Sequence, residues 1–180
     1  MDPPIIETDR FTLRGFVPGD LDRLAEILGD SEVMRYMPGS RPWTREMVGK
    51  ELDSIIEHWD RYPYGRWAVV DRRDSMMLGW CGLAYLPELD ETEVAYLLDR
   101  GYWNKGYATE AARISLRFGF EEAGLERIIA LAFPENAASI RVMEKIGMTY
   151  DKMTHIWRLD LVQYEITRDM HRRLGPLESQ

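Results

Sequence analysis

A predicted strand that runs through a glycine-bearing loop directly into a helix restricts the fold of this chain more than any other feature. We predict the strand over residues 91–98, the loop over Trp103–Ala108 and the helix from Thr109 to about Glu122. Backbone N–H groups at a helix start lack intrahelical partners, and the helix dipole favours negative charge there. Gly106 and Ala108 would let a phosphate approach the backbone closely. The segment therefore predicts either a phosphate cradle or a turn in which glycine serves only the geometry.

The rest of the pattern places this segment inside an α+β fold. Helices are expected from Asp20 to Gly29, from Thr44 onward, and from about Asn136 to Gly147. Strands are expected at residues 11–14, 67–70, 77–83, 91–98, 127–133 and, as two strands, 153–167. An antiparallel meander followed by strand–helix–strand–helix predicts a mixed sheet. At 180 residues, we expect one domain spanning residues 1–180.

Charge and composition exclude several partners. The net charge is −8 and the sequence pI is about 5.0, whereas a nucleic-acid partner calls for a basic surface. The acidic balance fits a cationic substrate such as an amine, which it would steer over long range. Neither a long uncharged apolar run nor a signal-peptide pattern occurs. We therefore expect a cytoplasmic protein without a membrane partner.

The chain has little material for a metal site or a thiol nucleophile. It contains one cysteine, Cys81, and three histidines that are scattered along the sequence, so no metal site is expected. Cys81 lies in the apolar run 77–83. Buried cysteines commonly behave as small hydrophobic residues, and we interpret Cys81 as a structural thiol.

Three segments carry a resemblance to a known family. They are Tyr-Trp-Asn-Lys-Gly-Tyr-Ala-Thr-Glu-Ala at 102–111, the run from Pro134 to Met148, and Ile-Glu-Thr-Asp-Arg-Phe-Thr-Leu-Arg at 6–14. In this order they resemble the signatures of the GNAT N-acetyltransferase superfamily. They are closest to its branch of ribosomal-protein N-terminal (alanine/serine) acetyltransferases. The resemblance covers about residues 6–168.

The resemblance implies a mostly antiparallel sheet splayed into a V, with helices on both faces and acetyl-CoA as co-substrate in the V. The backbone at Tyr96, Leu97 and Leu98 would then pair with the pantetheine arm. The pyrophosphate would lie on the loop after Trp103, formed by Asn104, Lys105, Gly106, Tyr107, Ala108 and Thr109. Further coenzyme contacts would come from Asn136, Ser139, Arg141 and Lys145. Arg141 and Lys145 have the alternative of forming a solvated helix face.

The sequence departs from the family at two positions. Trp103 stands where the broader family has Gln or Arg, although an aromatic residue is common in the branch. Met143 stands where many members carry a tyrosine that protonates the departing thiolate, and a thioether has no proton to give. Ser139, one turn earlier, is the candidate replacement. Its alternative role is to satisfy a backbone group at the helix start, with water protonating the thiolate.

The candidate base is Glu93, where several relatives place a carboxylate. Glu91 lies two residues earlier, on the same face of a regular strand, and the alternative for both is a solvated strand face. We expect the acceptor pocket to be framed by the first two helices and the loop from Tyr36 to Trp43. Trp59, Tyr62 and Tyr64 are further candidates, but packing in the core or a lid is the favoured alternative for each of these aromatic residues.

The function implied is transfer of acetyl to a primary amine, by direct attack in a ternary complex. The acceptor is expected to be the α-amino group of a protein or peptide N-terminus. The alternatives are a small amine (an aminoglycoside, a polyamine or an amino acid) and, in another class, an acetyl-CoA-binding sensor without turnover. The sequence is compatible with a monomer or a homodimer.

Overall fold

The computed structural model describes residues 2–175, so Met1 and residues 176–180 of the predicted 1–180 domain lie outside the described residues. The strands are β1 Ile6–Glu7, β2 Phe11–Arg14, β3 Arg66–Asp71, β4 Met77–Leu86, β5 Glu91–Leu98, β6 Arg127–Ala132, β7 Thr149–Ile156 and β8 Leu159–Thr167. The α-helices are α1 Leu21–Leu28, α2 Ser31–Met34, α3 Arg45–Arg61, α4 Tyr107–Glu121, α5 Ala137–Lys145 and α6 Arg168–Leu174. No helix within residues 2–175 has the length and apolar character needed to cross a membrane.

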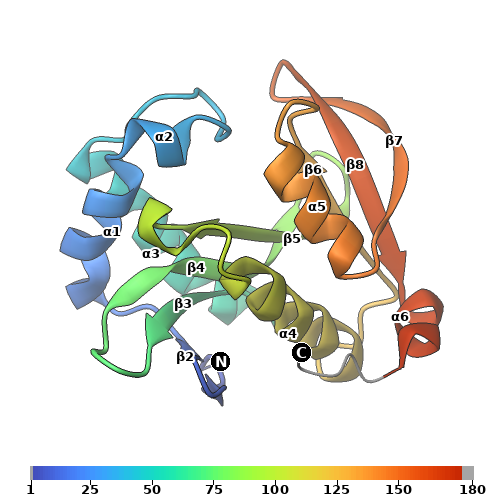
Figure 1. Ribbon diagram of the computed structural model, residues 1–180, viewed down its shortest axis with the longest axis horizontal. Coiled ribbons are helices and arrows are strands. Elements are labelled where there is room, and N and C mark those ends of the chain that lie inside the picture. The colour runs from blue at the N-terminus through green and yellow to red at the C-terminus, as the bar shows by residue number, and fades with distance from the viewer. Residues whose placement is uncertain (1, 176–180) are drawn as a thin grey trace.

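All of these strands join one sheet that splays apart in its middle. The strand order is β1-β2-β3-β4-β5-β6-β8-β7, and every described pairing is antiparallel except that between β5 and β6. The parallel pairing of β5 with β6 is made by Glu93 and Ile129 alone. Beyond this pair the strands diverge, and Figure 1 shows β5 and β8 running in different directions on the two sides. The predicted α+β fold with a V-shaped sheet is confirmed.

Two apolar clusters fill the two faces of the sheet. One contains Leu116 and Phe120 of α4 with Leu78 and Leu83 of β4. The other, on the opposite face, contains Leu24 of α1 and Val48 and Leu52 of α3 with Trp80 of β4 and Leu97 of β5. Alternate residues of a strand point to opposite faces, so β4 and β5 supply side chains to both clusters.

A cluster of charges holds the closed end of the V. The Arg127 guanidinium at the start of β6 donates to the carboxylates of Glu91 on β5, Asp151 on β7 and Glu165 on β8. Its Nη2 lies 3.0 Å from Asp151 Oδ2, and its Nε lies 2.7 Å from Glu165 Oε2. The arginine side chain is 32 % exposed. One guanidinium therefore ties together strands from both arms of the sheet.

Element boundaries differ from the sequence-based expectation in a few places. The helix predicted from Thr109 begins at Tyr107, because Gly106 adopts φ +81° and serves as its N-cap. The short helix α2 was not predicted, and it lies in the connection expected to be a loop. The last pair of strands begins at Thr149 rather than Met153. Strand β5 has the predicted bounds.

Gly79 permits the close pairing of β4 with β5. Its φ is +147°, a conformation that residues with a side chain rarely adopt. A Cβ added at this position would collide with the Leu97 carbonyl oxygen and would lie 2.7 Å from the Leu98 Cα. A side chain here would therefore push β5 away from β4 at the end of β5 nearest the loop.

We expect Gly79→Ala to lower the free energy of unfolding by at least about 2 kcal/mol, because backbone strain and overpacking add together. Urea denaturation followed by circular dichroism measures the change. Gly19→Ala is the control, because a Cβ at Gly19 meets nothing within 4 Å. Equal stabilities for the two variants would contradict the prediction.

Candidate active site

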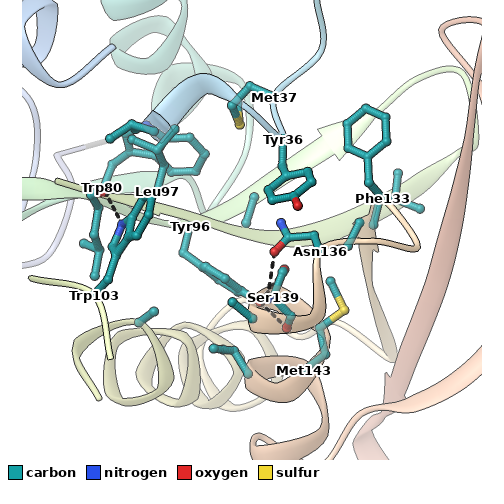
Figure 2. Close-up of a pocket in the computed structure, with 18 of the residues that line it drawn as sticks. Tyr36, Met37, Trp80, Tyr96, Leu97, Trp103, Phe133, Asn136, Ser139 and Met143 are labelled. Carbon is teal, nitrogen blue, oxygen red and sulfur yellow. Dashed lines mark hydrogen bonds between the residues drawn. The ribbon is translucent and has the colours of Figure 1, made fainter. Parts of the chain in front are cut away.

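A cleft of about 620 Å³ opens between the diverging arms of the sheet. Its walls come from α2 and the loop after it, from β5, from the loop before α4, from the end of β6 and from α5. Figure 2 shows side chains from these separate segments pointing toward one another. The volume falls within the range of small-molecule sites in proteins, about 300–1,000 Å³.

The predicted phosphate cradle forms one end of this cleft. Gly106 caps α4 in a left-handed conformation, and a Cβ added there would approach only the guanidinium of Arg10, at 3.6 Å. The first backbone N–H groups of α4 point away from the helix, which suits an anion. Arg10, in the turn between the edge strands β1 and β2, stabilises this loop. Its Nη2 donates to the Lys105 carbonyl oxygen at 2.7 Å, and its guanidinium stacks 3.9 Å from the centre of the Tyr107 ring.

The structure brings most of the predicted coenzyme residues into this one cleft. Those that line it are Tyr96, Leu97, Leu98, Trp103, Asn104, Gly106, Tyr107, Ala108, Thr109, Asn136, Ser139, Arg141 and Lys145. Lys105 does not line the cleft. Its Nζ donates to the Gly101 carbonyl oxygen at 2.8 Å, so the side chain folds back along the loop. The Lys105 ammonium is therefore not directed into the cleft.

Trp103 has a structural role that its place in the family motif did not indicate. Its indole Nε1 donates to the Leu98 carbonyl oxygen at 2.8 Å, a hydrogen bond drawn in Figure 2. The bond fastens the start of the loop to the end of β5. The Leu98 carbonyl oxygen therefore has one side-chain partner, and its second lone pair can still accept from a ligand.

The start of α5 presents a compact polar group to the cleft. Asn136 caps the helix, with its Oδ1 accepting from the Ser139 backbone N–H at 3.1 Å. The alternative role predicted for Ser139 was to satisfy a backbone group with its hydroxyl. Its hydroxyl instead pairs with a side chain, because Tyr96 Oη lies 3.0 Å from Ser139 Oγ. Met143 follows one turn later with 1 % exposure and also lines the cleft. From the sequence, only the backbone of Tyr96 was expected to take part. The structure shows that the Tyr96 side chain also lines the cleft.

Glu93 is a buried carboxylate rather than part of a solvated strand face. It is 9 % exposed, lines the cleft and lies 4.0 Å from Arg66 Nη2. Burial raises the pKa of Glu93, and the positive charge of Arg66 opposes that rise only in part. Glu91 does not line the cleft, because its carboxylate is bound by Arg127. The two glutamates therefore have different environments despite their spacing.

The acceptor side of the cleft contains residues that no local pattern indicated. Arg66 donates to Glu51 Oε1 at 2.6 Å and stacks 4.6 Å from the centre of the Trp80 ring, and all three line the cleft with Glu93. Fifteen positions separate Arg66 from Glu51, and the contact depends on how α3 packs on β3. Only the three-dimensional fold reveals this group.

Aromatic side chains from both arms complete the acceptor side. The Tyr36 and Phe133 rings lie 6.2 Å apart across the cleft, and Trp43 and Trp157 also line it. The expected frame from Tyr36 to Trp43 thus contributes. Trp59, Tyr62 and Tyr64 do not line the cleft. Trp59 is 2 % exposed and Tyr64 is 5 % exposed, and both belong to the core. Tyr62, at the end of α3, packs against this core cluster.

Cys81 is fully buried and its Sγ lies 3.5 Å from Ser115 Oγ. Burial raises the pKa of the Cys81 thiol to about 12, so it stays protonated at neutral pH. The prediction of a structural thiol is confirmed. Among residues 2–175, no group of three or more His, Cys, Asp or Glu side chains is placed to hold a metal ion.

Comparison with known proteins agrees with this site. A family model described as acetyltransferase (GNAT) domain matches residues 10–149. The Bacillus subtilis (strain 168) protein YkkB is 36% identical over 168 residues, which cover 88% of this chain and 92% of YkkB. The uncharacterized N-acetyltransferase YnaD of the same strain is 34% identical over 146 residues, covering 79% of this chain and 81% of YnaD.

The fold has close counterparts among solved structures. A GNAT-family acetyltransferase from Bacillus anthracis superposes with a TM-score of 0.79 at 29% identity, covering 92% of this chain and 99% of that one. The region matched by the family model, residues 10–149, includes the loop before α4, Glu93 on β5 and all of α5. The protein belongs to the GNAT family and is an acetyltransferase.

Proposed function

We propose that this acetyltransferase moves the acetyl group of acetyl-CoA to the α-amino group of a peptide or protein N-terminus, by direct attack while both substrates are bound. The observation that carries the proposal is the buried Glu93 carboxylate in the same cleft as the loop before α4. An α-amino group has a pKa near ~8, against ~10.4 for a lysine side chain, so it needs only a weak base. Burial raises the pKa of Glu93 and so brings it closer to the pKa of such an amine, which makes the carboxylate a better base.

The chain's own residues fit the coenzyme. Bound acetyl-CoA supplies the acyl group as a thioester. The backbone N–H groups at the start of α4 would hold its pyrophosphate, since Gly106 leaves the approach open. Arg141 and Lys145, one turn apart on α5 and exposed at the cleft, would neutralise further phosphate charge.

The charges on the acceptor side support an amine as the second substrate. Glu51, Glu93 and Arg66 together carry one net negative charge when ionised, in a cleft whose walls are otherwise largely apolar and aromatic. A protonated amine is therefore attracted before it loses its proton, and the chain's net charge of −8 adds long-range steering. We place the reaction in the cytoplasm, with the chain acting as a monomer or homodimer and without a nucleic-acid or membrane partner.

The fold accommodates a protein N-terminus in at least one other member. RimL, described as a ribosomal L7/L12 alpha-N-protein acetyltransferase in complex with coenzyme A, superposes with a TM-score of 0.79 at 15% identity. This likeness concerns the fold. It supports the proposal because an open V leaves room for an extended chain beside the coenzyme.

A small amine is the second candidate acceptor. Tyr36 and Phe133 approach each other across the cleft, which narrows the entrance on the acceptor side. A relative from Aspergillus fumigatus is named FsC-acetyl coenzyme A-N(2)-transacetylase. It is 31% identical over 130 residues, covering 67% of this chain and 54% of that protein. A sensor without turnover is disfavoured, because a buried carboxylate in the same cleft as the loop before α4 suits chemistry as well as binding.

Thiol release from acetyl-CoA, followed with a chromogenic thiol reagent, tests the acceptor. Cys81 is buried, so the folded protein contributes no signal. We expect release with peptides that have a free N-terminus, and none with the same peptides blocked at the N-terminus. Release only with polyamines, aminoglycosides or amino acids would replace the peptide proposal by the small-amine one. Failure with every amine despite acetyl-CoA binding would contradict both.

Glu93→Gln tests the base. We expect turnover to fall by about 10²-fold or more, because general-base catalysis contributes roughly 10²–10⁴, while acetyl-CoA affinity changes by less than about twofold. Steady-state kinetics together with calorimetric binding of acetyl-CoA separate the two effects. The control is Glu91→Gln, whose carboxylate lies outside the cleft. Turnover that survives in Glu93→Gln at limiting pH would remove Glu93 from the reaction.

The same variant has a predicted pH dependence of stability. Burial raises the folded-state pKa of Glu93, so its ionisation reduces stability as the pH rises from the unfolded value of ~4.3 through the folded value. Glu93→Gln lacks this loss, and it should gain stability relative to the wild type between about pH 4 and about pH 8. Urea midpoints at both pH values measure the effect. If the difference in stability between Glu93→Gln and the wild type is the same at both pH values, the predicted pH dependence is wrong.

A further inference from the structure

Two hydroxyl groups meet inside the cleft although 43 positions separate them in the chain. The phenol oxygen of Tyr96, on β5, lies 3.0 Å from Ser139 Oγ and 3.1 Å from the Ser139 carbonyl oxygen, on α5. Figure 2 shows the Tyr96 ring reaching from the strand to the start of the helix, with Met143 beside the pair. Both residues line the cleft. The two elements come from opposite sides of the V, so the pair bridges it.

Glu93 and Tyr96 reach the cleft from opposite faces of the same strand. Successive side chains of a strand alternate, and the odd-numbered neighbours Ala95 and Leu97 pack with the cluster formed by α1 and α3. The even-numbered Val94 and Leu98 pack with the cluster that contains α4. In acyl transfer the attacking nitrogen and the departing sulfur occupy different positions around the acyl carbon. Strand β5 thus offers a carboxylate on the side of the acceptor residues and a phenol on the side of α5.

The position of Ser139 on α5 is fixed through its backbone N–H, and the nearby Met143 has no proton to donate. Asn136 Oδ1 accepts from the Ser139 N–H, which fixes where the serine sits. Met143, one turn later, is buried against the same region, and its sulfur has no proton to donate. The Ser139 hydroxyl is therefore the donor that α5 presents here, and its direction depends on Tyr96.

We propose that Tyr96 is a positioning residue for the departure of the coenzyme A thiolate: its phenol O–H is shared between the Ser139 carbonyl oxygen and Ser139 Oγ, which leaves the Ser139 O–H to be donated to the sulfur. This inference rests on the proposed transfer to an amine. The new C–N bond forms as the C–S bond breaks, and the electron pair of the C–S bond stays on sulfur. The proton lost by the amine goes to Glu93. The thiolate is stabilised by Ser139 and takes its proton from solvent on release.

The environment of Tyr96 suits this role. Burial raises the pKa of the phenol, so Tyr96 keeps its proton and remains a hydrogen-bond donor throughout the neutral range. Hydrogen bonds to an ionised acceptor are stronger than those to a neutral one. A donor aimed at sulfur therefore stabilises the departing thiolate more than it stabilises the thioester, which is the condition for accelerating the reaction.

A direct test uses coenzyme A alone and does not require a known acceptor. The thiol of bound coenzyme A is titrated through the ultraviolet absorption of its thiolate, in the wild type and in Tyr96→Phe. Free thiols ionise near ~8.5, and a donor from Ser139 should lower the pKa of the bound thiol. We expect Tyr96→Phe and Ser139→Ala each to raise that pKa by at least about half a unit relative to the wild type. Equal values in the wild type and Tyr96→Phe would overturn the proposal.

Kinetics with any amine that supports turnover give a second readout. We expect Tyr96→Phe to lower kcat about tenfold with KM for acetyl-CoA changed by less than about twofold. Ser139→Ala should show the same loss, and the double variant no further loss, since the two hydroxyls act as one unit. Additive losses, or a fall in acetyl-CoA affinity that accounts for the whole effect, would overturn the positioning role. Absence of turnover with every amine would contradict the proposed function and would leave the titration as the test of Tyr96.

Tyr64→Phe is the matched control. Tyr64 Oη lies 2.8 Å from Thr92 Oγ1, also a residue of β5, in a buried pair of hydroxyls. The substitution removes the same group from the same kind of bond, but Tyr64 does not line the cleft. We expect Tyr64→Phe to change thermal stability without changing kcat or the pKa of the bound thiol. A loss of kcat equal to that of Tyr96→Phe would show that any lost hydroxyl against β5 has this effect, and would overturn the proposal.

Discussion

The short parallel contact between β5 and β6, tied by Arg127, is the constraint on which the rest of the molecule depends. The strands pair through Glu93 and Ile129, and Arg127 holds carboxylates of three strands at this closed end. Past the contact, backbone groups at the facing edge of β5 lose the neighbour that a continuous sheet would provide. Buried backbone groups require partners, so this edge is suited to a ligand that lies along it. The cleft exists because the pairing stops.

The position of β5 between two cores explains how one strand presents both Glu93 and Tyr96, the residues for which roles are proposed. Side chains on one face pack with the helices α1 and α3, and those on the other face pack with α4. Both cores are well filled, so the strand is held firmly along its length while its edge stays open. Glu93 and Tyr96 are then presented to a shared space by a rigid element, which places side chains more reproducibly than a loop does. The loop after α2 also lines this cleft.

Much of the fold was predictable because its signals are local. The turn before Glu91 and the loop after Leu98 bound β5, and the glycine at 106 marks the helix start within two residues. Helix α2 escaped prediction because four residues are too few to show a 3.6-residue period. The resemblance of short motifs to the family pointed to most of the residues that line the cleft at the loop before α4 and at α5. It also pointed to Lys105, whose side chain instead turns back to Gly101.

The acceptor side was not predictable for the opposite reason. Arg66, Glu51 and Trp80 come from β3, α3 and β4, and their meeting depends on how a helix packs on a sheet. The Tyr96–Ser139 contact likewise joins segments with no common pattern. No periodicity or spacing reports such contacts. The residues on the proposed acceptor side are therefore the ones that sequence reasoning identifies least well in this fold.

The bond from Arg10 to the loop before α4 links coenzyme binding to the margin of the sheet. Arg10 lies in the turn between β1 and β2, and β1 consists of Ile6 and Glu7 alone, so this hairpin is the outermost element on its side. Edge hairpins open by local fluctuation far more often than a domain unfolds globally. Each opening releases the Lys105 carbonyl from its guanidinium and frees the anion-binding loop. With the coenzyme pyrophosphate on this loop, as proposed, its retention is coupled to fraying of the first strands, and bound coenzyme should slow amide hydrogen exchange in the hairpin.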